Sequence, residues 1–560
     1  MTSIHKGFVQ VPHGQVHFRY GGSGPIVVML HGSPRSSVVH APDIAWLGEH
    51  FTVVALDTPG CGNSSPLPPE AGSIPGFARA LAETLTALGI GRCAVYGTRS
   101  GAKVALQFAI DHPEQAALTL LDGLSLLPAP ASEEVLQRHL EPIEPTTDGA
   151  HLARHWSRIL DIHRYFPWFE RTPEARLNLA LPGDANLHEF ATDVFMSGGR
   201  WTDAYGAALR HEAAPQVSLL RSPTVFMCRE DDLLYPSLDR LPQPLPARCS
   251  IERIAPRQSS WRTRLLELLR RADLPRQAWS PPRPPVDAGA PGERDRYVDL
   301  VHGQLRVRLA GRAGTATPLL LLNDAPGGSS ATRRLARSMA SDRLTICPDL
   351  PGLGESHPLP YPTLGSFVTA LHELLEQLEV PVVDVAAAGL GCCFAVALAA
   401  HQSKHVRRLA LDGIPMIRSR DRRRVARQYC PPIEPDRSGS QLHRAWHLLR
   451  DAESSWPWYD RSAAAARVRE PVLDACGLQD DLVEVVKHLP SYGEAASAAI
   501  DASVRDILKA VRQPVLLFEV PVDVRYAGTA RAAQRLASAR ALPRPSRTDD
   551  RADALRAFFA

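Results

Sequence analysis

Short runs of apolar residues alternate with longer segments of helical period through the first half of the chain. The runs have the length of buried strands and lie at 25–30, 51–56, 93–96, 116–121, 223–228 and 250–254. Apolar residues recur at helical spacing over 77–88 and 100–112. Apolar strands that alternate with helices predict a parallel sheet covered on both faces, and the segment 8–20 predicts an antiparallel edge.

The stretch 128–222 interrupts this alternation. It is rich in Trp, Tyr, Phe, His and Arg and lacks a clear strand pattern, which predicts a helical insertion. Open α/β sheets bind ligands at the carboxyl ends of their strands, so we expect this insertion to form a cap over a pocket. The second half has an equivalent stretch at 417–513.

The second half of the chain repeats the first at an offset close to 290 residues. The matched segments are 13–15 and 302–304, 57–62 and 349–354, 121–123 and 411–413, and 142–145 and 432–435. Collinear matches of this number indicate a duplication. We therefore predict two domains, 1–272 and 297–560, joined by a Pro/Gly-rich linker over 273–296.

The composition narrows the classes of partner and cofactor. The 560 residues hold 63 basic and 60 acidic side chains, and their spread leaves no basic block that predicts a nucleic-acid partner. No apolar run has the length of a signal peptide core or a membrane span, so we expect a cytoplasmic protein without a membrane partner. The nine cysteines lack metal-ligand spacing, and we expect neither a metal nor another cofactor. The oligomeric state is not indicated.

Four motifs in the first half stand in a fixed order. They are His31-Gly32 after one strand, the segment 57–62 after the next, the glycine-framed turn 97–101, and the segment 223–232. With this order and spacing the sequence resembles the α/β-hydrolase superfamily over nearly all of both halves. The resemblance implies tandem α/β-hydrolase folds, each an eight-stranded, mostly parallel sheet with helices on both faces and a helical cap.

The turn 97–101 corresponds to the nucleophile elbow of that superfamily, in which the central residue points into the pocket. The central residue here is Arg99, which cannot act as a nucleophile. Ser100 stands one place later, where the family uses the backbone N–H as an oxyanion donor. The place of the histidine base, 255–261, holds no histidine.

Two acids fit the family's positions for the third member of the triad. Asp232 fits the usual place, and Asp122 fits an alternative place one strand earlier. Asp122 recurs as Asp412 in the second half, which favours a structural role such as hydrogen bonding to loop backbone.

The second half departs further from the family pattern. Asn323-Asp324 replaces the His-Gly pair, Gly389 stands at the nucleophile position, and 541–548 contains no histidine. Asp523 aligns with Asp232. Since glycine has no side chain to attack a substrate, we predict that this half is a pseudo-domain.

An unusual site in the first half is one interpretation of these residues. Arg99 would hold a carboxylate or stabilise an oxyanion, with Ser100 and the loop residues His31, Gly32 and Ser33 around it. A base would come from the cap histidines, which are His155, His163, His188 and His211. The alternative is an Arg99 ion pair with Asp122 or Asp232 that fills an inactive site.

Trp168 and its counterpart Trp458 are candidates to line an apolar pocket, although aromatic residues at this density also form the core of a helical insertion. Two functions follow from these patterns. The first is a hydrolase-family enzyme that acts on a small organic acid, ester or ketone around Arg99. The alternative is a non-catalytic pseudo-hydrolase that binds a small-molecule ligand or scaffolds a complex.

Overall fold

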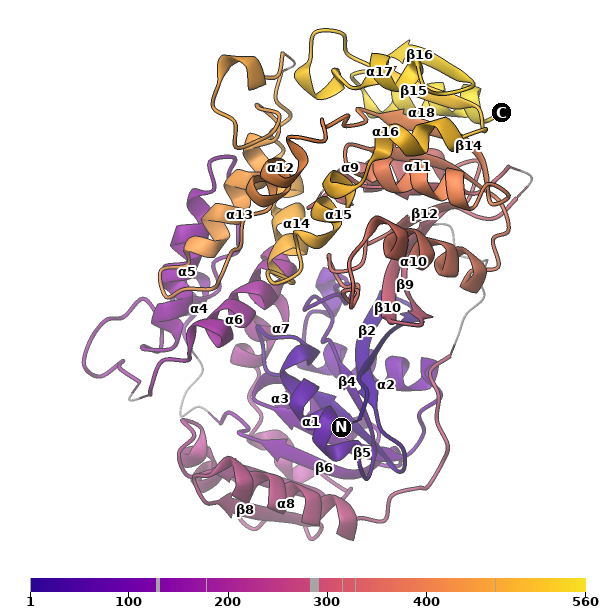
Figure 1. Cartoon of the computed structure of the whole chain (residues 1–560). Coiled ribbons are helices and arrows are strands. Elements are labelled where there is room, and N and C mark those ends of the chain that lie inside the picture. The colour runs from indigo at the N-terminus through magenta and orange to yellow at the C-terminus, as the bar shows by residue number, and fades with distance from the viewer. Residues whose placement is uncertain are drawn as a thin grey trace. The chain divides into compact units, whose positions relative to one another are not determined.

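The computed structural model describes residues 2–126, 131–177, 179–282, 292–314, 316–327, 329–468 and 470–560, without the side chains of 329–331. The chain divides into two units, 1–144 with 154–283 and 145–153 with 284–560 (Figure 1). Residues 283–291 of the predicted linker, 128–130 and 178 of the first predicted cap and 469 of the second lie outside the described residues.

The sheet of the first unit has eight strands in the order β1-β2-β4-β3-β5-β6-β7-β8. β1 and β2 pair antiparallel, as do β2 and β4, and the remaining pairs are parallel. The predicted mostly parallel sheet with an antiparallel edge is confirmed. The strands are β1 (His5–Val11), β2 (Gly14–Gly21), β3 (Ile26–Leu30), β4 (Thr52–Leu56), β5 (Cys93–Thr98), β6 (Ala116–Asp122), β7 (Thr224–Arg229) and β8 (Cys249–Ile254).

Helices pack on both faces of this sheet and form two apolar cores. The bounds are α1 (Ala41–Leu47), α2 (Ile74–Ala87), α3 (Ser100–Asp111) and α8 (Gln258–Arg271). One core joins α2 and α3 to the sheet through Phe77 and Phe108, and the other joins α1 and α8 through Leu47 and Leu265. Strands that are buried on both faces need this double cover.

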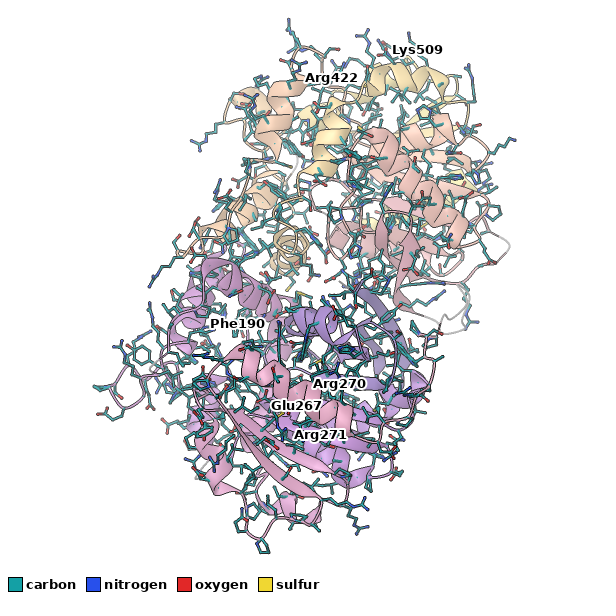
Figure 2. The ribbon with its side chains drawn as sticks, turned by 60° about the horizontal axis from the view of Figure 1, so that its bottom comes forward. Phe190, Glu267, Arg270, Arg271, Arg422 and Lys509 are labelled. Atoms are coloured by element: carbon teal, nitrogen blue, oxygen red, sulfur yellow. The ribbon has the colours of Figure 1, made fainter. Side chains whose placement is uncertain are left out.

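Helix α8 is amphipathic, with one face buried against the sheet and the other exposed to solvent. Its residues Trp261, Leu265 and Leu269 are buried, whereas Arg270 and Arg271 are exposed (Figure 2). The spacing of these buried residues keeps them on one face of the helix. The sequence pattern therefore determines which side of α8 covers the sheet.

Further helices are inserted between β6 and β7. They are α4 (Glu133–His139), α5 (Ala150–Ile162), α6 (Asp184–Ser197) and α7 (Trp201–Arg210). In the described part of this stretch there is no strand longer than the single bridge between Tyr165 and Arg176. The absence of period-two patterning in the sequence accounts for this helical character.

The second unit repeats the architecture, with eight strands in the order β16-β15-β14-β13-β11-β12-β10-β9. The strands are β9 (Glu293–Leu300), β10 (Gly303–Ala310), β11 (Leu319–Leu322), β12 (Thr345–Pro348), β13 (Val383–Ala388), β14 (Val406–Asp412), β15 (Val515–Glu519) and β16 (Ala539–Pro543). The helices are α9 (Ser329–Met339), α10 (Leu364–Gln377), α11 (Gly391–His401), α12 (Arg422–Tyr429), α13 (Ser440–Asp451), α14 (Ala475–Val486), α15 (Glu494–Asp501), α16 (Val504–Ile507), α17 (Thr529–Ala533) and α18 (Thr548–Phe559).

The predicted linker is not an extended, solvated segment at either of its ends. Trp279 packs on Phe18 and Tyr20, and its indole N–H donates to the Leu88 carbonyl at 2.8 Å. At the other end β9 begins at Glu293, because its pairing with β10 continues to Ala310. Proline and glycine content identified the segment but did not reveal these contacts.

A buried carboxylate fixes the loops that surround the site of the first unit. Asp57 accepts hydrogen bonds from His17 Nδ1 at 2.8 Å, from Ser37 N at 2.7 Å and from Asn63 N at 2.9 Å. Burial alone would raise the pKa of Asp57, but His17 and Arg19 hold it below its ordinary value. Asp57 therefore joins β2, the loop after β3 and the loop after β4. Within the described residues, no helix is long and apolar enough to cross a membrane.

Candidate functional site

The turn between β5 and α3 keeps the geometry of a nucleophile elbow. Arg99 has φ 54° and ψ −114°, and its N–H donates to the Asp122 carbonyl at 3.1 Å. Left-handed backbone is rare for a residue with a Cβ, and it places the side chain at the apex of the turn. At Gly101 a Cβ would lie 2.6 Å from the carbonyl oxygens of Leu30 and His31. The glycine frame is therefore required by close backbone packing.

The Arg99 guanidinium pairs with Asp232, one of the two partners considered from the sequence. The distance from Nη2 to Asp232 Oδ2 is 2.8 Å, and the two side chains are 48% and 27% exposed. The other oxygen of Asp232 accepts from the Leu234 N–H at 2.9 Å. An ion pair this exposed contributes at most about 1 kcal/mol, so it does not hold Arg99 tightly.

Ser100 is directed toward the loop after β3. Its hydroxyl oxygen accepts from the Ser33 N–H at 2.6 Å and donates to Ser33 Oγ at 3.1 Å. Among the described residues these are the hydrogen bonds of the Ser100 hydroxyl, and neither involves a base. The contact also uses the Ser33 N–H, which stands where the family resemblance places an oxyanion donor.

The His31 side chain, which the sequence placed among the substrate-binding residues, is fully buried. Nε2 accepts from the Thr58 N–H at 2.9 Å, and Nδ1 lies 3.2 Å from the Gly32 carbonyl oxygen. Burial lowers the pKa of His31 to about 4. The neutral imidazole thus bridges two loops. Gly32 lets the loop approach the elbow, because a Cβ there would lie 3.1 Å from the Cβ of Arg99.

Asp122 is held by two aromatic side chains. Its Oδ2 accepts from Tyr96 Oη at 2.6 Å and from Trp261 Nε1 at 2.7 Å. These donors differ from the loop backbone expected from the sequence. Burial raises the pKa of Asp122 in spite of both hydrogen bonds. Trp261 lies in the segment 255–261, where the family has its histidine base. The Asp122 carboxylate therefore orients the indole of Trp261 and not an imidazole.

The inserted helices hold the remaining predicted residues. Trp168 Nε1 donates to the His139 carbonyl at 3.3 Å, and its ring lies 5.0 Å from the Arg158 guanidinium carbon. This packing corresponds to the interpretation of Trp168 as part of a helical core. The four candidate base histidines lie in the same inserted region. His155 packs edge-on against Phe195, and His163 Nδ1 donates to the Ile159 carbonyl at 2.8 Å. His188 lies in α6, and burial lowers the pKa of His211.

In the second unit the carboxylate of Asp324, from the loop after β11, packs against the equivalent turn, a contact that the sequence did not reveal. Gly389 has φ 53°, and a Cβ there would overlap the Asp324 carboxylate. Asp324 Oδ1 accepts from the N–H groups of Leu390 at 2.8 Å and Ala325 at 3.0 Å, while Oδ2 accepts from Arg525 at 2.6 Å. The signal in the sequence was Asp324 in place of a glycine beside the elbow.

The acids of the second unit are also paired within it. Asp523 is buried and accepts from Arg467 at 3.3 Å and from the Arg525 N–H at 2.9 Å. Asp412 accepts from Tyr526 Oη at 2.5 Å and from Arg544 Nε at 2.9 Å. Burial would raise the pKa of Asp412, but Arg544 and Tyr526 lower it. Within the described residues no cluster of His, Cys, Asp and Glu could hold a metal ion.

Comparison with known proteins identifies the family. The family described as alpha/beta hydrolase fold matches residues 25–252 and 317–431, which together exceed half of the chain. The chain belongs to the α/β hydrolase fold family. Both matched regions begin at the first parallel strand of a unit, so the family assignment applies to each half of the duplication.

Individual relatives of this family match one part of the chain. A protein named carbamate hydrolase RutD from Escherichia coli O157:H7 is 38% identical over 218 residues, which are 38% of this chain and 76% of that protein. RutD of Enterobacter cloacae is 28% identical over 217 residues, with the same shares of each chain. The solved enol-lactonase from Burkholderia xenovorans LB400 is 20% identical with a TM-score of 0.36, and the match covers 47% of this chain and 96% of that one.

The buried His31 predicts a pH dependence of stability. Its folded-state pKa of about 4 lies below the ordinary 6.5, so the unfolded chain binds more protons between these values. The stabilisation is present above pH 6.5 and is lost as the pH falls toward 4. From pH 7 to pH 5 we expect wild type to lose about 2 kcal/mol more unfolding free energy than His31→Asn. Urea unfolding at each pH, monitored by hydrogen exchange of peptides from β3 and β4, measures this difference. Equal losses would contradict it.

The elbow conformation predicts a difference between two substitutions that both remove the guanidinium. Backbone strain at φ 54° persists in Arg99→Ala and is relieved in Arg99→Gly, as in the second unit at Gly389. The greater freedom of glycine in the unfolded chain offsets part of this gain. We expect Arg99→Gly to be more stable than Arg99→Ala by about 1 kcal/mol in chemical denaturation. A lower stability for the glycine variant would contradict the strained apex.

Proposed function

We propose that this α/β hydrolase-fold protein binds small-molecule anions without nucleophilic catalysis, and that Arg99 is the anion-binding group of the first unit. One observation carries the proposal. In each unit a backbone donor that stands in an oxyanion position is engaged by one of the chain's own side chains, Ser33 N by Ser100 and Leu390 N by Asp324. A reaction that builds negative charge on a substrate oxygen needs such donors to be available.

The surroundings of Arg99 support anion binding. The Arg99 side chain is about half exposed. The carboxylate oxygen of Asp232 that does not contact Arg99 accepts a hydrogen bond from the Leu234 N–H. A bidentate carboxylate or phosphate can replace an exposed carboxylate at low cost. Helix α3 begins at Ser100, directly after Arg99, and its N-terminal dipole adds to the positive potential.

An enzyme that acts on a small organic acid, ester or ketone is the second candidate. The retained left-handed backbone at Arg99 favours it, because backbone strain persists mainly where function requires it. Arg99 would then stabilise charge that develops on a substrate oxygen, and Asp232 would be the nearest acid. The names of the RutD relatives, carbamate hydrolase, fit this class of substrate.

A fluorophosphonate probe separates these candidates from ordinary serine hydrolysis. Because Ser100 is bonded to Ser33 and no base contacts it among the described residues, we expect its hydroxyl to stay unlabelled. Mass spectrometry of probe-treated protein measures labelling at this position. Ser218→Ala, which removes an exposed serine, serves as the control. Labelling that Ser100→Ala abolishes and Ser218→Ala retains would overturn the proposal.

Anion binding at Arg99 is tested with malonate and inorganic phosphate as probes. We expect at least one of them to raise the melting temperature of the wild-type chain, and the rise to fall at least threefold in Arg99→Ala because the charged donor is lost. Arg248→Ala removes an exposed arginine directly before β8, at the amino ends of the parallel strands, whereas Arg99 lies at their carboxyl ends; this variant should retain the full rise. An unchanged rise in Arg99→Ala, or no rise in wild type, would exclude Arg99 as the site.

A further inference from the structure

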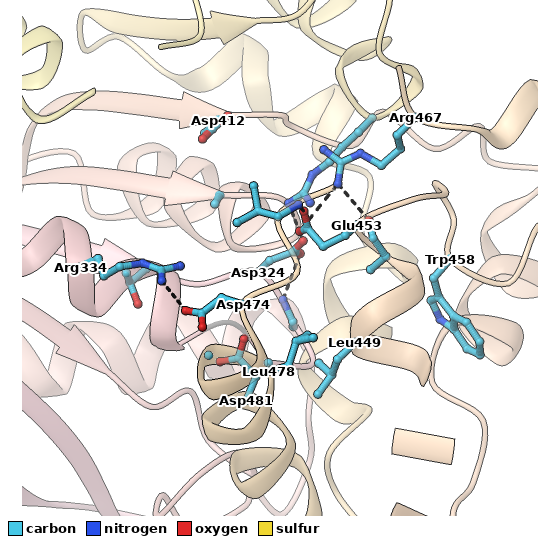
Figure 3. A pocket seen from close by; sticks show the side chains of 18 of the residues that line it. Asp324, Arg334, Asp412, Leu449, Glu453, Trp458, Arg467, Asp474, Leu478 and Asp481 are labelled. Atoms are coloured by element: carbon cyan, nitrogen blue, oxygen red, sulfur yellow. Dashed lines mark hydrogen bonds and ion pairs between the residues drawn. The ribbon is translucent and has the colours of Figure 1, made fainter. Parts of the chain in front are cut away.

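A pocket of about 530 Å³ lies within the second unit, beside the elbow at Gly389. Figure 3 shows its lining, which includes Asp324 and Asp412 near the strand ends, Leu449, Trp458 and Leu478 from the inserted region, and the buried Arg467. Such a volume is in the range of small-molecule sites. Since Asp324 engages the backbone donors at the elbow, the pocket is suited to binding and not to nucleophilic chemistry.

The two copies of the repeat differ in the side chains beside this pocket. Tyr96 and Trp261 of the first unit form an edge-on pair, with ring centroids 5.9 Å apart, beside Asp122. At the repeat offset of about 290 residues their counterparts are Ala386 and Arg551. Replacing both rings removes a large volume of side chain from this face of the sheet.

A small cavity of about 60 Å³ lies beside Ala386 and Arg551, the counterparts of these rings. Its walls are mostly apolar and come from β11, β13, β14, β15, α9 and α18, including Ala410 and Leu555. It shares Asp412 and Arg551 with the larger pocket, so the two spaces adjoin at a charged junction. A ligand with a polar head and a short apolar tail matches this arrangement.

The charges at the junction specify the head group. Three guanidinium groups, those of Arg525, Arg544 and Arg551, face the two carboxylates of Asp324 and Asp412. The Nε–H groups of Arg525 and Arg551 are buried and have no hydrogen-bond partner. Two buried donors and one surplus positive charge favour a ligand with a single negative charge.

Of these three arginines, Arg551 has the longest distance to a carboxylate oxygen. Its Nη1 lies 3.5 Å from Asp412 Oδ2, whereas Arg544 Nε lies 2.9 Å from both oxygens of the same carboxylate. Burial lowers the pKa of Arg551, and the neighbouring Arg544 lowers it further. A second carboxylate beside Arg551 would remove this imbalance.

We propose that the second unit binds a short aliphatic carboxylic acid, with its carboxylate on the guanidinium group of Arg551 and its hydrocarbon tail in the cavity beside Ala386. This site goes beyond the proposed function, which rests on Arg99 in the first unit. Binding is reversible and breaks no bond.

The test is calorimetric titration of the full chain with hexanoate, acetate and hexanamide, in the Arg99→Ala background so that the anion site proposed for the first unit does not contribute. We expect hexanoate to bind one site at least tenfold more tightly than either acetate, which lacks the tail, or hexanamide, which lacks the charge. Arg551→Leu should weaken hexanoate at least tenfold. Ala386→Tyr, which restores the side chain of the first unit, should remove the preference for hexanoate over acetate.

One matched variant locates the effect. Arg540→Leu, made in the same Arg99→Ala background, removes an exposed arginine of β16 that does not line the pocket. It should bind hexanoate as the Arg99→Ala chain does, and circular dichroism of every variant confirms folding. Equal affinity for hexanoate and hexanamide, unchanged binding in Arg551→Leu, or no hexanoate binding at millimolar concentration would each overturn the proposal.

Discussion

The left-handed turn between a central strand and its following helix is the constraint around which each unit is arranged. In both copies the backbone at this turn has φ close to +54°, and the glycine two residues later abuts the carbonyl oxygens of the preceding loop. This packing leaves little freedom for the backbone, because carbonyl oxygens cannot move without breaking the sheet. The residue at the apex can vary, and the chain has Arg99 in one copy and Gly389 in the other.

A buried carboxylate lies among the loops beside this turn in each copy, and different cations accompany it in the two copies. In the first, a histidine and an arginine accompany Asp57. In the second, Arg306 takes the position of the histidine and lies 3.6 Å from Asp349. Burial and the nearby Glu484 raise the pKa of Asp349 to about 6. Neighbouring cations therefore compensate the burial of Asp349 less completely than that of Asp57.

The sequence predicted the fold well because the signals were local or periodic. Apolar runs, the spacing of glycines around Arg99 and the collinear repeat all reflect backbone geometry that is repeated in space. The contacts of the site depend on side-chain direction between distant residues. Trp261 reaches Asp122 across 139 positions, and Asp324 reaches Leu390 across 66. No pattern along the chain encodes these contacts, so the residues at the family's catalytic positions could be located but their partners could not.

The residues that occupy the oxyanion donors are not equivalent within the repeat. In the first unit the occupant is Ser100, one position after the apex, whereas in the second it is Asp324, from the loop after β11. An ancestral single-unit protein could have passed on one of these arrangements to both copies, but not two different ones. At least one arrangement therefore arose after the gene was duplicated, and the two halves have since followed separate evolutionary histories.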